Sequence, residues 1–463
     1  MTYFFNKSPK LVKFIETKHR KIYTKIPTKQ SLEIINSLEK HEPKSMNQEL
    51  PLVWNRANGY QIFDDEGNTW IDFSSGIFVT NIGHSNPSVK KAIMDTVNQD
   101  LLHNYYFPSK IRSNLTKKLI EISPPELDKV FLLTTGAEAT ECALKLSRIY
   151  GKKIHPNKLG VLCFDGSMHG KTLGALTMGG KPKEKHWIGE LDPNIHHIPF
   201  PYGKTCPWRE NHLHICSKIC FEKSLDNLQK SGVNLSTICS VMIESYQGWG
   251  AMFYPQDYID AIKNWSKKNN SLIIFDEIQS GFGRTGKLFA FEHYKITPDL
   301  ICCGKGISSS LPLSAVIGRK DIVDVDPSLN STHGGNPICC AATLASIEVL
   351  INENLVDKAS KLGTYLENEL KNLQKKYSTI ISDVCGKGLI FAIHFINPKT
   401  NFYDVEFVDR LIEKCMEKGL LLVRTGSGTV KIGPPLIIPE DALLEGVEII
   451  DESILECIKD GNA

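Results

Sequence analysis

The stretch that decides the fold is residues 272–319, which read LIIFDEIQSGFGRTGKLFAFEHYKITPDLICCGKGISSSLPLSAVIGR. Its first four residues, 272–275, are apolar and rich in branched side chains, a pattern typical of a strand buried on both faces of a parallel sheet. Asp276 follows at the carboxyl end of that strand. A second apolar run, 300–303, leads into Gly304-Lys305-Gly306. We therefore expect two strands, one ending in a carboxylate and the other in a lysine framed by glycines.

This pair of side chains suits one cofactor in particular. A lysine set between glycines at a strand end is not typical of a solvated surface charge. Pyridoxal phosphate (PLP) needs an amine for its aldehyde and an acid for its pyridine nitrogen, and Lys305 and Asp276 supply these two groups. Further upstream, an apolar run at 130–133 passes through Gly136 and Ala137 into a helical pattern. The first N–H groups of such a helix and the positive end of its dipole suit a phosphate.

The same residues carry a family resemblance. The run FDEIQSGFGRTG at 275–286, followed by Pro298-Asp299 and Lys305-Gly306, resembles the signature of the class III PLP-dependent aminotransferases, the group that includes ornithine and 4-aminobutyrate aminotransferases. The resemblance implies an α/β protein of PLP fold type I. It implies a large domain with a mostly parallel seven-stranded sheet, a smaller α+β C-terminal domain, and a homodimer with shared active sites.

The resemblance also implies roles for individual residues. Lys305 would hold PLP as a Schiff base and act as the catalytic base, and Asp276 would keep the ring nitrogen protonated. Thr332, in the run Ser331 to Pro337, would reach the phosphate of the neighbouring subunit's cofactor. The remaining cofactor-binding residues implied in this way are Gly136, Ala137, Met168, His169, Glu244 and Gln279. Met168 stands where the family usually has an aromatic residue stacked on the ring, so we expect a less rigid contact there.

The positions that would face the substrate depart from the family pattern. Trp249 occupies the place of a glutamate that acts as a charge switch in ω-aminotransferases, and tryptophan cannot take that role. Lys431 stands in for an arginine that commonly binds the substrate carboxylate; it keeps the charge and loses the bidentate fork. Ile77 lies in the run that the family places at the substrate end of the pocket. These departures indicate an amino donor unlike ornithine or 4-aminobutyrate.

The chain order suggests four parts. We expect an N-terminal helical segment at 1–50, a β-hairpin part of the small domain at 51–85, the PLP-binding large domain at 86–340, and the small C-terminal domain at 341–463. Residues 181–236 are interpreted as an insertion between core elements.

Composition narrows the class of protein. The chain has 463 residues, of which 41% are hydrophobic, as is usual for a globular protein. Its net charge of +2 is too small to attract nucleic acid electrostatically. No apolar run approaches the roughly 20 residues of a membrane helix. The thirteen cysteines include pairs in apolar surroundings and favour a reduced, cytoplasmic protein. The basic start lacks a secretory h-region, whereas organelle targeting stays open because no acidic residue precedes Glu16.

The proposed insertion holds five potential metal ligands, Cys206, His212, His214, Cys216 and Cys220. Their spacing, C-x5-H-x-H-x-C-x3-C, is not a standard pairing of zinc knuckles. We therefore expect no metal and a polar surface loop with scattered side chains, and leave a structural metal as the alternative.

Three activities are compatible with these residues. The leading hypothesis is transfer of an amino group from an amino acid or ω-amine to a 2-oxo acid. An amino-acid racemase or epimerase could use the same site if the proton returned to Cα. A binding protein that kept the fold without catalysis is the third, and the complete set of Lys305, Asp276 and the phosphate turn argues against it.

Overall fold

The computed structural model describes residues 5–47, 49–209 and 214–461. The chain divides into two compact units. One consists of Pro87–Val356, and the other combines the residues up to Asn86 with those from Asp357 onward.

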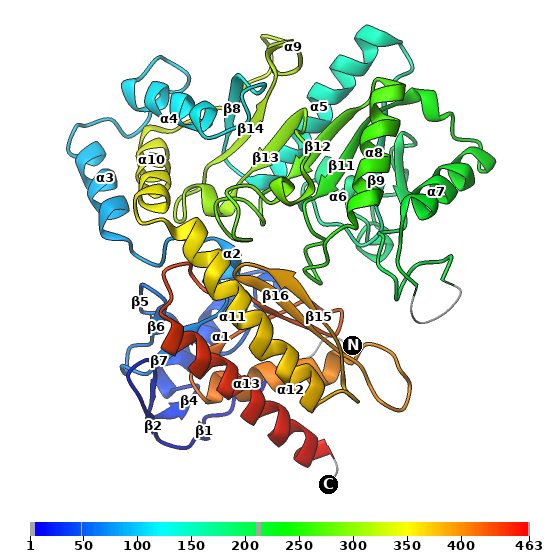
Figure 1. The fold of residues 1–463 in the computed structure, drawn as a ribbon. Helices are drawn as coiled ribbons and strands as arrows, with labels where there is room; N and C mark the ends of the chain where they lie inside the picture. Colours follow the sequence, from blue (N-terminus) through cyan, green and yellow to red (C-terminus); the bar gives the residue numbers. More distant parts are fainter. Residues whose placement is uncertain (1–4, 48, 210–213, 462–463) are drawn as a thin grey trace. The chain divides into compact units, whose positions relative to one another are not determined.

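The unit Pro87–Val356 is built on a seven-stranded sheet (Figure 1). Its strand order is β10-β9-β11-β12-β13-β14-β8, and all neighbours are parallel except β14, which runs antiparallel to both β13 and β8. The strands are β8 (Lys129–Leu133), β9 (Gly160–Phe164), β10 (Ile195–Ile198), β11 (Ile238–Glu244), β12 (Leu272–Asp276), β13 (Leu300–Cys303) and β14 (Ser314–Gly318). The predicted mostly parallel seven-stranded sheet is confirmed.

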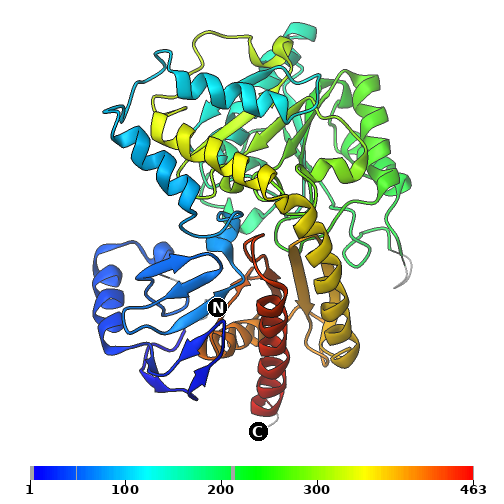
Figure 2. The same cartoon turned by 60° about the vertical axis from the view of Figure 1, so that its left-hand side comes forward.

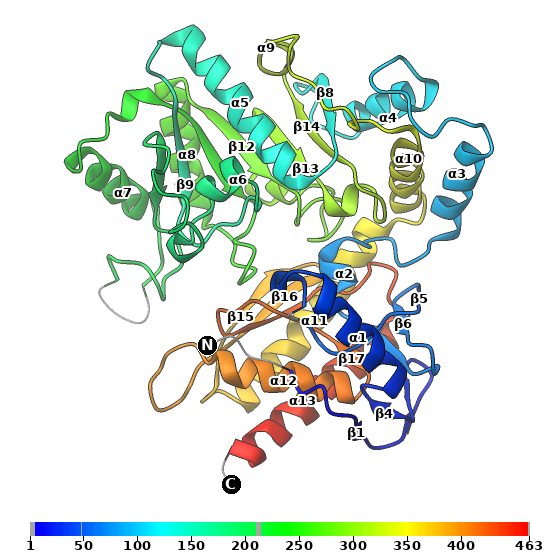
Figure 3. The ribbon, with the colours of Figure 1, turned by 180° about the vertical axis from the view of Figure 1, so that it is seen from behind.

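Helices cover both faces of this sheet. Its strands carry apolar side chains on both faces, and the helices that connect the strands bury them. α5 (Gly136–Ile154) lies over one face and α8 (Gln256–Asn269) over the other, as the front and back views show (Figures 1 and 3). α10 (Pro337–Asn352) packs beside α3 (Pro87–Val97) and α4 (Lys110–Glu121), seen in yellow, blue and cyan in Figure 2. The other helices are α6 (Leu173–Met178), α7 (Lys218–Lys230) and α9 (Lys320–Val323).

The second unit contains three further sheets among its described residues. One is a four-stranded antiparallel sheet of order β15-β16-β19-β18. Another has the path β2-β3-β7-β6-β5, with β17 pairing parallel to β7, and β1 pairs with β4 in the third. Its strands are β1 (Lys10–Leu11), β2 (Ile15–Glu16), β3 (Lys21–Ile22), β4 (Lys25–Ile26), β5 (Arg56–Asn58), β6 (Gln61–Phe63), β7 (Thr69–Asp72), β15 (Ile381–Lys387), β16 (Ile390–Phe395), β17 (Leu420–Leu421), β18 (Val423–Arg424) and β19 (Thr429–Ile432). Its helices are α1 (Lys29–His41), α2 (Ser75–Phe78), α11 (Leu355–Lys376), α12 (Val405–Glu417) and α13 (Glu440–Gly461).

The structure differs from the expected division of the chain in three places. Among the described residues of the N-terminal segment 1–50, an α-helix lies at Lys29–His41 and a 3-10 helix at Lys44–Met46, and strands β1 to β4 precede both. The expected insertion 181–236 is partly core, because β10 is the edge strand of the seven-stranded sheet. The boundary expected between 340 and 341 lies instead between Val356 and Asp357, since α10 packs on α3 and α4.

In the part of the chain that the structure describes, no single helix is both long and apolar enough for a membrane span. The consecutive helices α10 and α11 reach that length and composition only when they are taken together.

Candidate active site

The strands of the large sheet bring the predicted cofactor residues to one edge. β11 and β12 pair in parallel with Glu244 opposite Asp276, the last residue of each strand. β12 and β13 also pair in parallel, with Asp276 opposite Cys302. Lys305 follows Cys302 by three residues and therefore lies near the same edge of the sheet as Asp276. The carboxyl ends of parallel strands are the usual place for a ligand in such a sheet. The register therefore explains why Glu244, Asp276 and Lys305 meet.

These side chains line one cavity of about 190 Å³. Eight of the nine predicted cofactor residues contribute to its wall, and only Thr332 does not. Four more lining residues were not predicted. The cavity is lined by Gly136, Ala137, Met168, His169, Gly170, Glu244, Tyr246, Asp276, Ile278, Gln279, Ser280 and Lys305.

Lys305 is held in an unusual backbone conformation at the end of β13. Its φ is +45°, in the left-handed region that side chains other than glycine rarely adopt. Gly304 precedes it, and an added Cβ at Gly304 would lie 3.1 Å from the Ile278 side chain. Burial lowers the pKa of the Lys305 amine, while the carboxylates of Asp276 and Glu244 oppose that change. Strained backbone of this kind is concentrated at functional sites.

Asp276 is tied to a histidine as well as to the backbone. Its Oδ2 lies 2.8 Å from Nδ1 of His169, and its Oδ1 accepts the N–H of Ile278 at 3.1 Å. Both side chains are buried. Nε2 of His169 is also buried and has no hydrogen-bond partner among the described residues. A buried polar atom without a partner is rare in a folded protein and indicates a place where another molecule belongs.

Glu244 lies beside this pair. Its two carboxylate oxygens accept the backbone N–H groups of Met168 and Gly248, each at 3.2 Å. Burial raises the pKa of Glu244 to about 7; His169 opposes the rise and Asp276 adds to it. Near neutral pH this carboxyl therefore exchanges its proton readily.

Gln279 and Tyr246 form the next part of the wall. The Tyr246 hydroxyl donates to Oε1 of Gln279 at 3.1 Å. The amide oxygen of Gln279 accepts this bond, and the amide NH2 group is a hydrogen-bond donor. An amide donor is the group that a phenolate oxygen requires.

The N-terminus of α5 also lines the cavity, through Gly136 and Ala137. Thr135 and Glu138 make a capping box: the Thr135 hydroxyl accepts from Glu138 N–H, and Glu138 Oε2 accepts from the N–H groups of Thr135 and Thr134 at 2.8 and 3.0 Å. The N–H groups of Gly136 and Ala137 are not part of that box. An added Cβ at Gly136 would lie 3.0 Å from Ile278, so the glycine allows a close approach.

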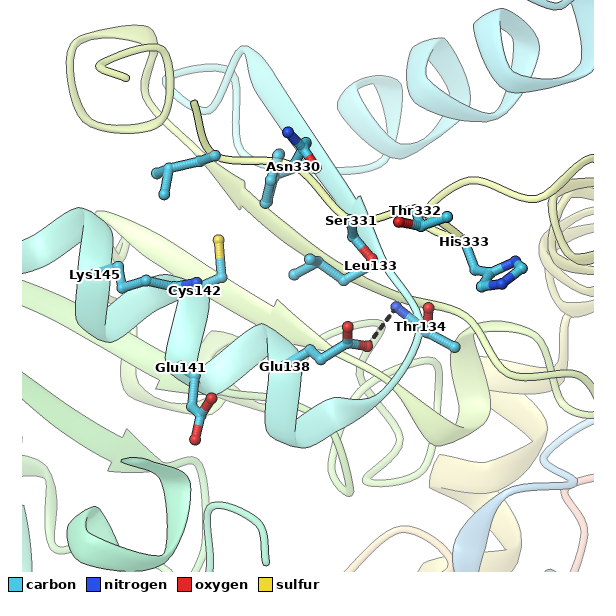
Figure 4. A pocket seen from close by; sticks show the side chains of 12 residues that line it. Leu133, Thr134, Glu138, Glu141, Cys142, Lys145, Asn330, Ser331, Thr332 and His333 are labelled. Atoms are coloured by element: carbon cyan, nitrogen blue, oxygen red, sulfur yellow. Dashed lines mark hydrogen bonds between the residues drawn. The ribbon is translucent and has the colours of Figure 1, made fainter. Parts of the chain in front are cut away.

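Thr332 lies in a separate, neighbouring pocket. This pocket of about 330 Å³ includes Thr134, Glu138 and the loop that carries Thr332, and Figure 4 shows Glu138 turned toward the Thr134 N–H. Thr332 is exposed and does not line the cofactor cavity of its own chain.

The three predicted substrate residues fall into both units. Trp249, in the same unit as the cavity, donates its indole N–H to Oε1 of Gln247 at 2.9 Å, and Gln247 in turn donates to the carbonyl of Asp165 at 2.6 Å. In the other unit, Lys431 is buried with its Nζ 4.3 Å from the centre of the Phe78 ring. Ile77 precedes Phe78, is 47% exposed, and has a φ of +63°.

The cavity fits PLP by the chemistry of its walls. It offers a buried amine for an aldehyde, a carboxylate for a ring nitrogen, and a helix N-terminus for a phosphate. The buried His169 nitrogen, which has no hydrogen-bond partner among the described residues, indicates that a further group belongs there. Fold and site together define a PLP-dependent enzyme of fold type I.

Comparison with known proteins identifies the family. The model of the family described as Aminotransferase class-III matches residues 43–454, and the chain belongs to this family. It is 34% identical over 441 residues to 4-aminobutyrate aminotransferase of Mycobacterium leprae, covering 93% of this chain and 97% of that one. It is 30% identical to alanine/serine racemase of Pyrococcus horikoshii, covering 98% and 96% of the two chains.

A solved structure is similar throughout. Ornithine aminotransferase of Toxoplasma gondii, described with partial occupancy of PLP at its active site, superimposes with a TM-score of 0.81 at 25% identity and covers 95% of this chain and 97% of that one. The protein is therefore an enzyme that carries out PLP-dependent transamination. The hypothesis of a non-catalytic binding protein loses its basis.

Proposed function

We propose that Lys305 would hold PLP through its amine and that the same amine would move the proton at the substrate Cα. The cofactor, when bound, accepts the electrons of the Cα–H bond. Because burial lowers the pKa of Lys305, its amine is neutral in a larger fraction of molecules than an exposed lysine would be. A neutral amine is the form that can attack an aldehyde or take a proton.

The neighbouring acids would divide the remaining tasks. Asp276 would hold a positive charge at the ring nitrogen, and His169 would fix the orientation of that carboxylate through the 2.8 Å contact. Glu244 and Gln279 would lie toward the phenolic oxygen. Gly136 and Ala137 would bind the phosphate through their N–H groups, and Met168, which is 43% exposed, would contact the ring through its thioether.

The observation that best supports this proposal is that Lys305, Asp276 and Glu244 line one cavity. They do so because the three neighbouring strands β11, β12 and β13 pair in parallel with their ends aligned. The direct test is to incubate the purified holoenzyme with single amino donors and then with pyruvate, 2-oxoglutarate or glyoxylate. We expect the cofactor spectrum to change with the donor and to return with the acceptor. A spectrum that no donor changes contradicts the proposal.

We infer that the preferred donor carries a carboxylate and an apolar side chain. Trp249 would present an apolar indole at the charge-switch position, and an indole offers no counter-charge for a second charged group on the donor. Lys431 would provide a single positive charge for the donor carboxylate in place of an arginine fork. A donor screen should therefore rank apolar amino acids above ornithine and 4-aminobutyrate, and the reverse order would contradict this inference.

We also propose a homodimer in which each cofactor contacts both subunits. The exposed position of Thr332 outside the cavity of its own chain supports this arrangement. The test mixes Lys305→Ala and Thr332→Ala subunits. With shared sites, one site of the mixed dimer combines both changes and the other is entirely wild type, so activity recovers above that of either parent. Without sharing, every site carries one change and no such recovery occurs.

A racemase is the second candidate, because the alanine/serine racemase of Pyrococcus horikoshii resembles nearly the whole chain. The two activities differ in where the proton returns. Incubation with a single L-amino acid and no 2-oxo acid separates them: steady inversion of configuration supports the racemase. A single turnover that stops until an acceptor is added supports transamination.

For location we propose the cytoplasm. All thirteen cysteines are free, and most are buried, which supports a reducing compartment. Fractionation of cells that produce the protein with a C-terminal tag tests this proposal, and recovery in an organelle fraction would contradict it.

A further inference from the structure

Four potential metal ligands that do not line the cofactor cavity lie close together. They lie on the segment that links β10 to α7 and in the first turn of α7, and they are Cys206, His214, Cys216 and Cys220. One ligand atom from each lies within 4.8 Å of all the others. The three cysteines are buried and the histidine is half-buried. We expected scattered side chains from the sequence, and the structure brings these four together; His212 lies outside the described residues.

The distances match a single tetrahedral ion. Zinc binds thiolate sulfur at about 2.3 Å and imidazole nitrogen at about 2.0–2.1 Å, which places two sulfurs about 3.8 Å apart and a sulfur and a nitrogen about 3.5 Å apart. The Sγ atoms of Cys206 and Cys220 are 3.8 Å apart, and Sγ of Cys220 is 3.5 Å from Nε2 of His214. A disulfide needs an S–S distance of about 2.05 Å, so the cysteines are not paired in that way.

The backbone around the cluster is built to hold it. The N–H of Arg209 bonds to the carbonyl of Cys206 at 3.1 Å, closing a turn directly after the first cysteine. The backbone at Gly203 lies close to the backbone at His214: a Cβ added at Gly203 would lie 2.1 Å from the His214 carbonyl oxygen. Cys216 and Cys220 flank the N-cap Ser217, where the helix dipole favours a thiolate.

The cluster also has a chemical reason to bind a cation. Three thiol groups and one imidazole lie around a common centre, and a cation bound there would stabilise the thiolate forms and hold the four side chains together.

We propose that Cys206, His214, Cys216 and Cys220 bind one Zn²⁺ in a closed Cys₃His site. Thiolate and imidazole ligands in a tetrahedron select zinc, and four protein ligands leave no open position for catalysis. The ion fastens the loop that follows β10 to α7. α7 is itself fixed to α8, since Phe221 packs against Tyr258 and Trp265 with ring centres 5.4 and 6.2 Å apart. The role is therefore structural and independent of PLP.

The first experiment measures the metal content of the full-length enzyme after dialysis against EDTA. We expect one zinc per chain, retained in the Lys305→Ala variant and lost in Cys206→Ser and Cys216→Ser. Cys385→Ser, which changes a half-buried cysteine outside the cluster, is the matched control and should keep the metal. Absence of metal, iron in place of zinc, or a Cys206–Cys220 disulfide found by peptide mapping would overturn the proposal.

The second experiment does not depend on a variant folding. X-ray absorption of the zinc-loaded wild-type enzyme should show three sulfur atoms at about 2.3 Å and one nitrogen at about 2.0–2.1 Å. A shell dominated by oxygen and nitrogen would mean adventitious zinc and would refute the Cys₃His site.

Discussion

The cofactor cavity and the substrate positions of this protein differ in how far they follow the class III pattern. In the unit Pro87–Val356, the residues expected to hold the cofactor, Lys305, Asp276, Glu244 and Gln279, line one cavity. The residues proposed to face the substrate, Trp249 and Lys431, differ in charge or shape from the types that the family resemblance implies. The chemistry of PLP requires particular groups at fixed atoms, whereas substrate binding tolerates several solutions. The comparison therefore predicts that cofactor chemistry and substrate preference depend on separate sets of residues.

The most severe test of this comparison removes the Lys305 amine from the cofactor cavity. Lys305→Ala should lower kcat by about 10²–10⁴-fold or more, the usual contribution of a positioned acid–base group. The control is Lys287→Ala, an exposed lysine in the same stretch of sequence, which should leave kcat unchanged. Retention of near-normal turnover in the Lys305 variant would mean that another residue carries the chemistry.

The next effect concerns the charge beside the ring nitrogen. Asp276→Asn keeps the shape of the side chain and removes its charge, so we expect kcat to fall by about 10²–10³-fold, as when one preorganised electrostatic group is lost. Single-turnover kinetics with the preferred donor measures the change. Asp95→Asn, on the exposed surface of α3, serves as the control. If the single-turnover rate of Asp276→Asn equals that of the wild type, a residue other than Asp276 must interact with the ring nitrogen.

Glu244 provides a test through stability rather than rate. Because its pKa is raised from 4.5 to about 7 in the folded protein, its contribution to stability is fully present below about pH 4.5 and is lost as the pH rises toward 7. The loss amounts to about 3 kcal/mol. Glu244→Gln should remove this decline in the PLP-free protein, whereas exposed Glu190→Gln should keep it. Urea unfolding at pH 5 and pH 8 measures both, and an equal decline in Glu244→Gln would contradict the prediction.

The smallest effect lies in the substrate positions. Lys431→Met removes a buried charge, and we expect KM for carboxylate donors to rise about tenfold with little change in kcat, since a charged hydrogen bond contributes about 1.5–3 kcal/mol. Lys399→Met, on the surface, is the control. A fall in kcat with constant KM would place Lys431 in the chemical step and weaken the separation of the two residue sets.

Much of the large unit could be predicted from its sequence, for physical reasons. The strands β9, β11, β12 and β13 are short, mostly apolar runs. β11 and β12 end in an acid, β9 is followed by Asp165 and β13 by Gly304-Lys305, so both the burial of these strands and their functional ends can be recognised. The capping sequence Thr135 to Glu138 equally marks the start of α5. The pair His169–Asp276 could not be derived in this way, because a loop residue and a strand-end residue 107 positions apart in sequence form it.

Other features gave weak or misleading signals. Strands β1 to β4 have two residues each, one of them charged, so they are too short to show an alternation that a sequence pattern could detect. β10 reads IHHI, and its histidines obscured an edge strand within the expected insertion. Tyr246 stood in the sequence directly before Gln247-Gly248 and could have been singled out by that position. The Cys206 to Cys220 cluster has irregular spacing, and only the folded loop brings its ligands together.

The most direct test of the central claim is to reduce the PLP-loaded enzyme with borohydride and map the modified peptide by mass spectrometry. The reduced cofactor should be attached to Lys305, the residue that follows Gly304 at the end of β13. Attachment to a different lysine, or a protein that takes up no PLP, would contradict the assignment of this cavity as the active site.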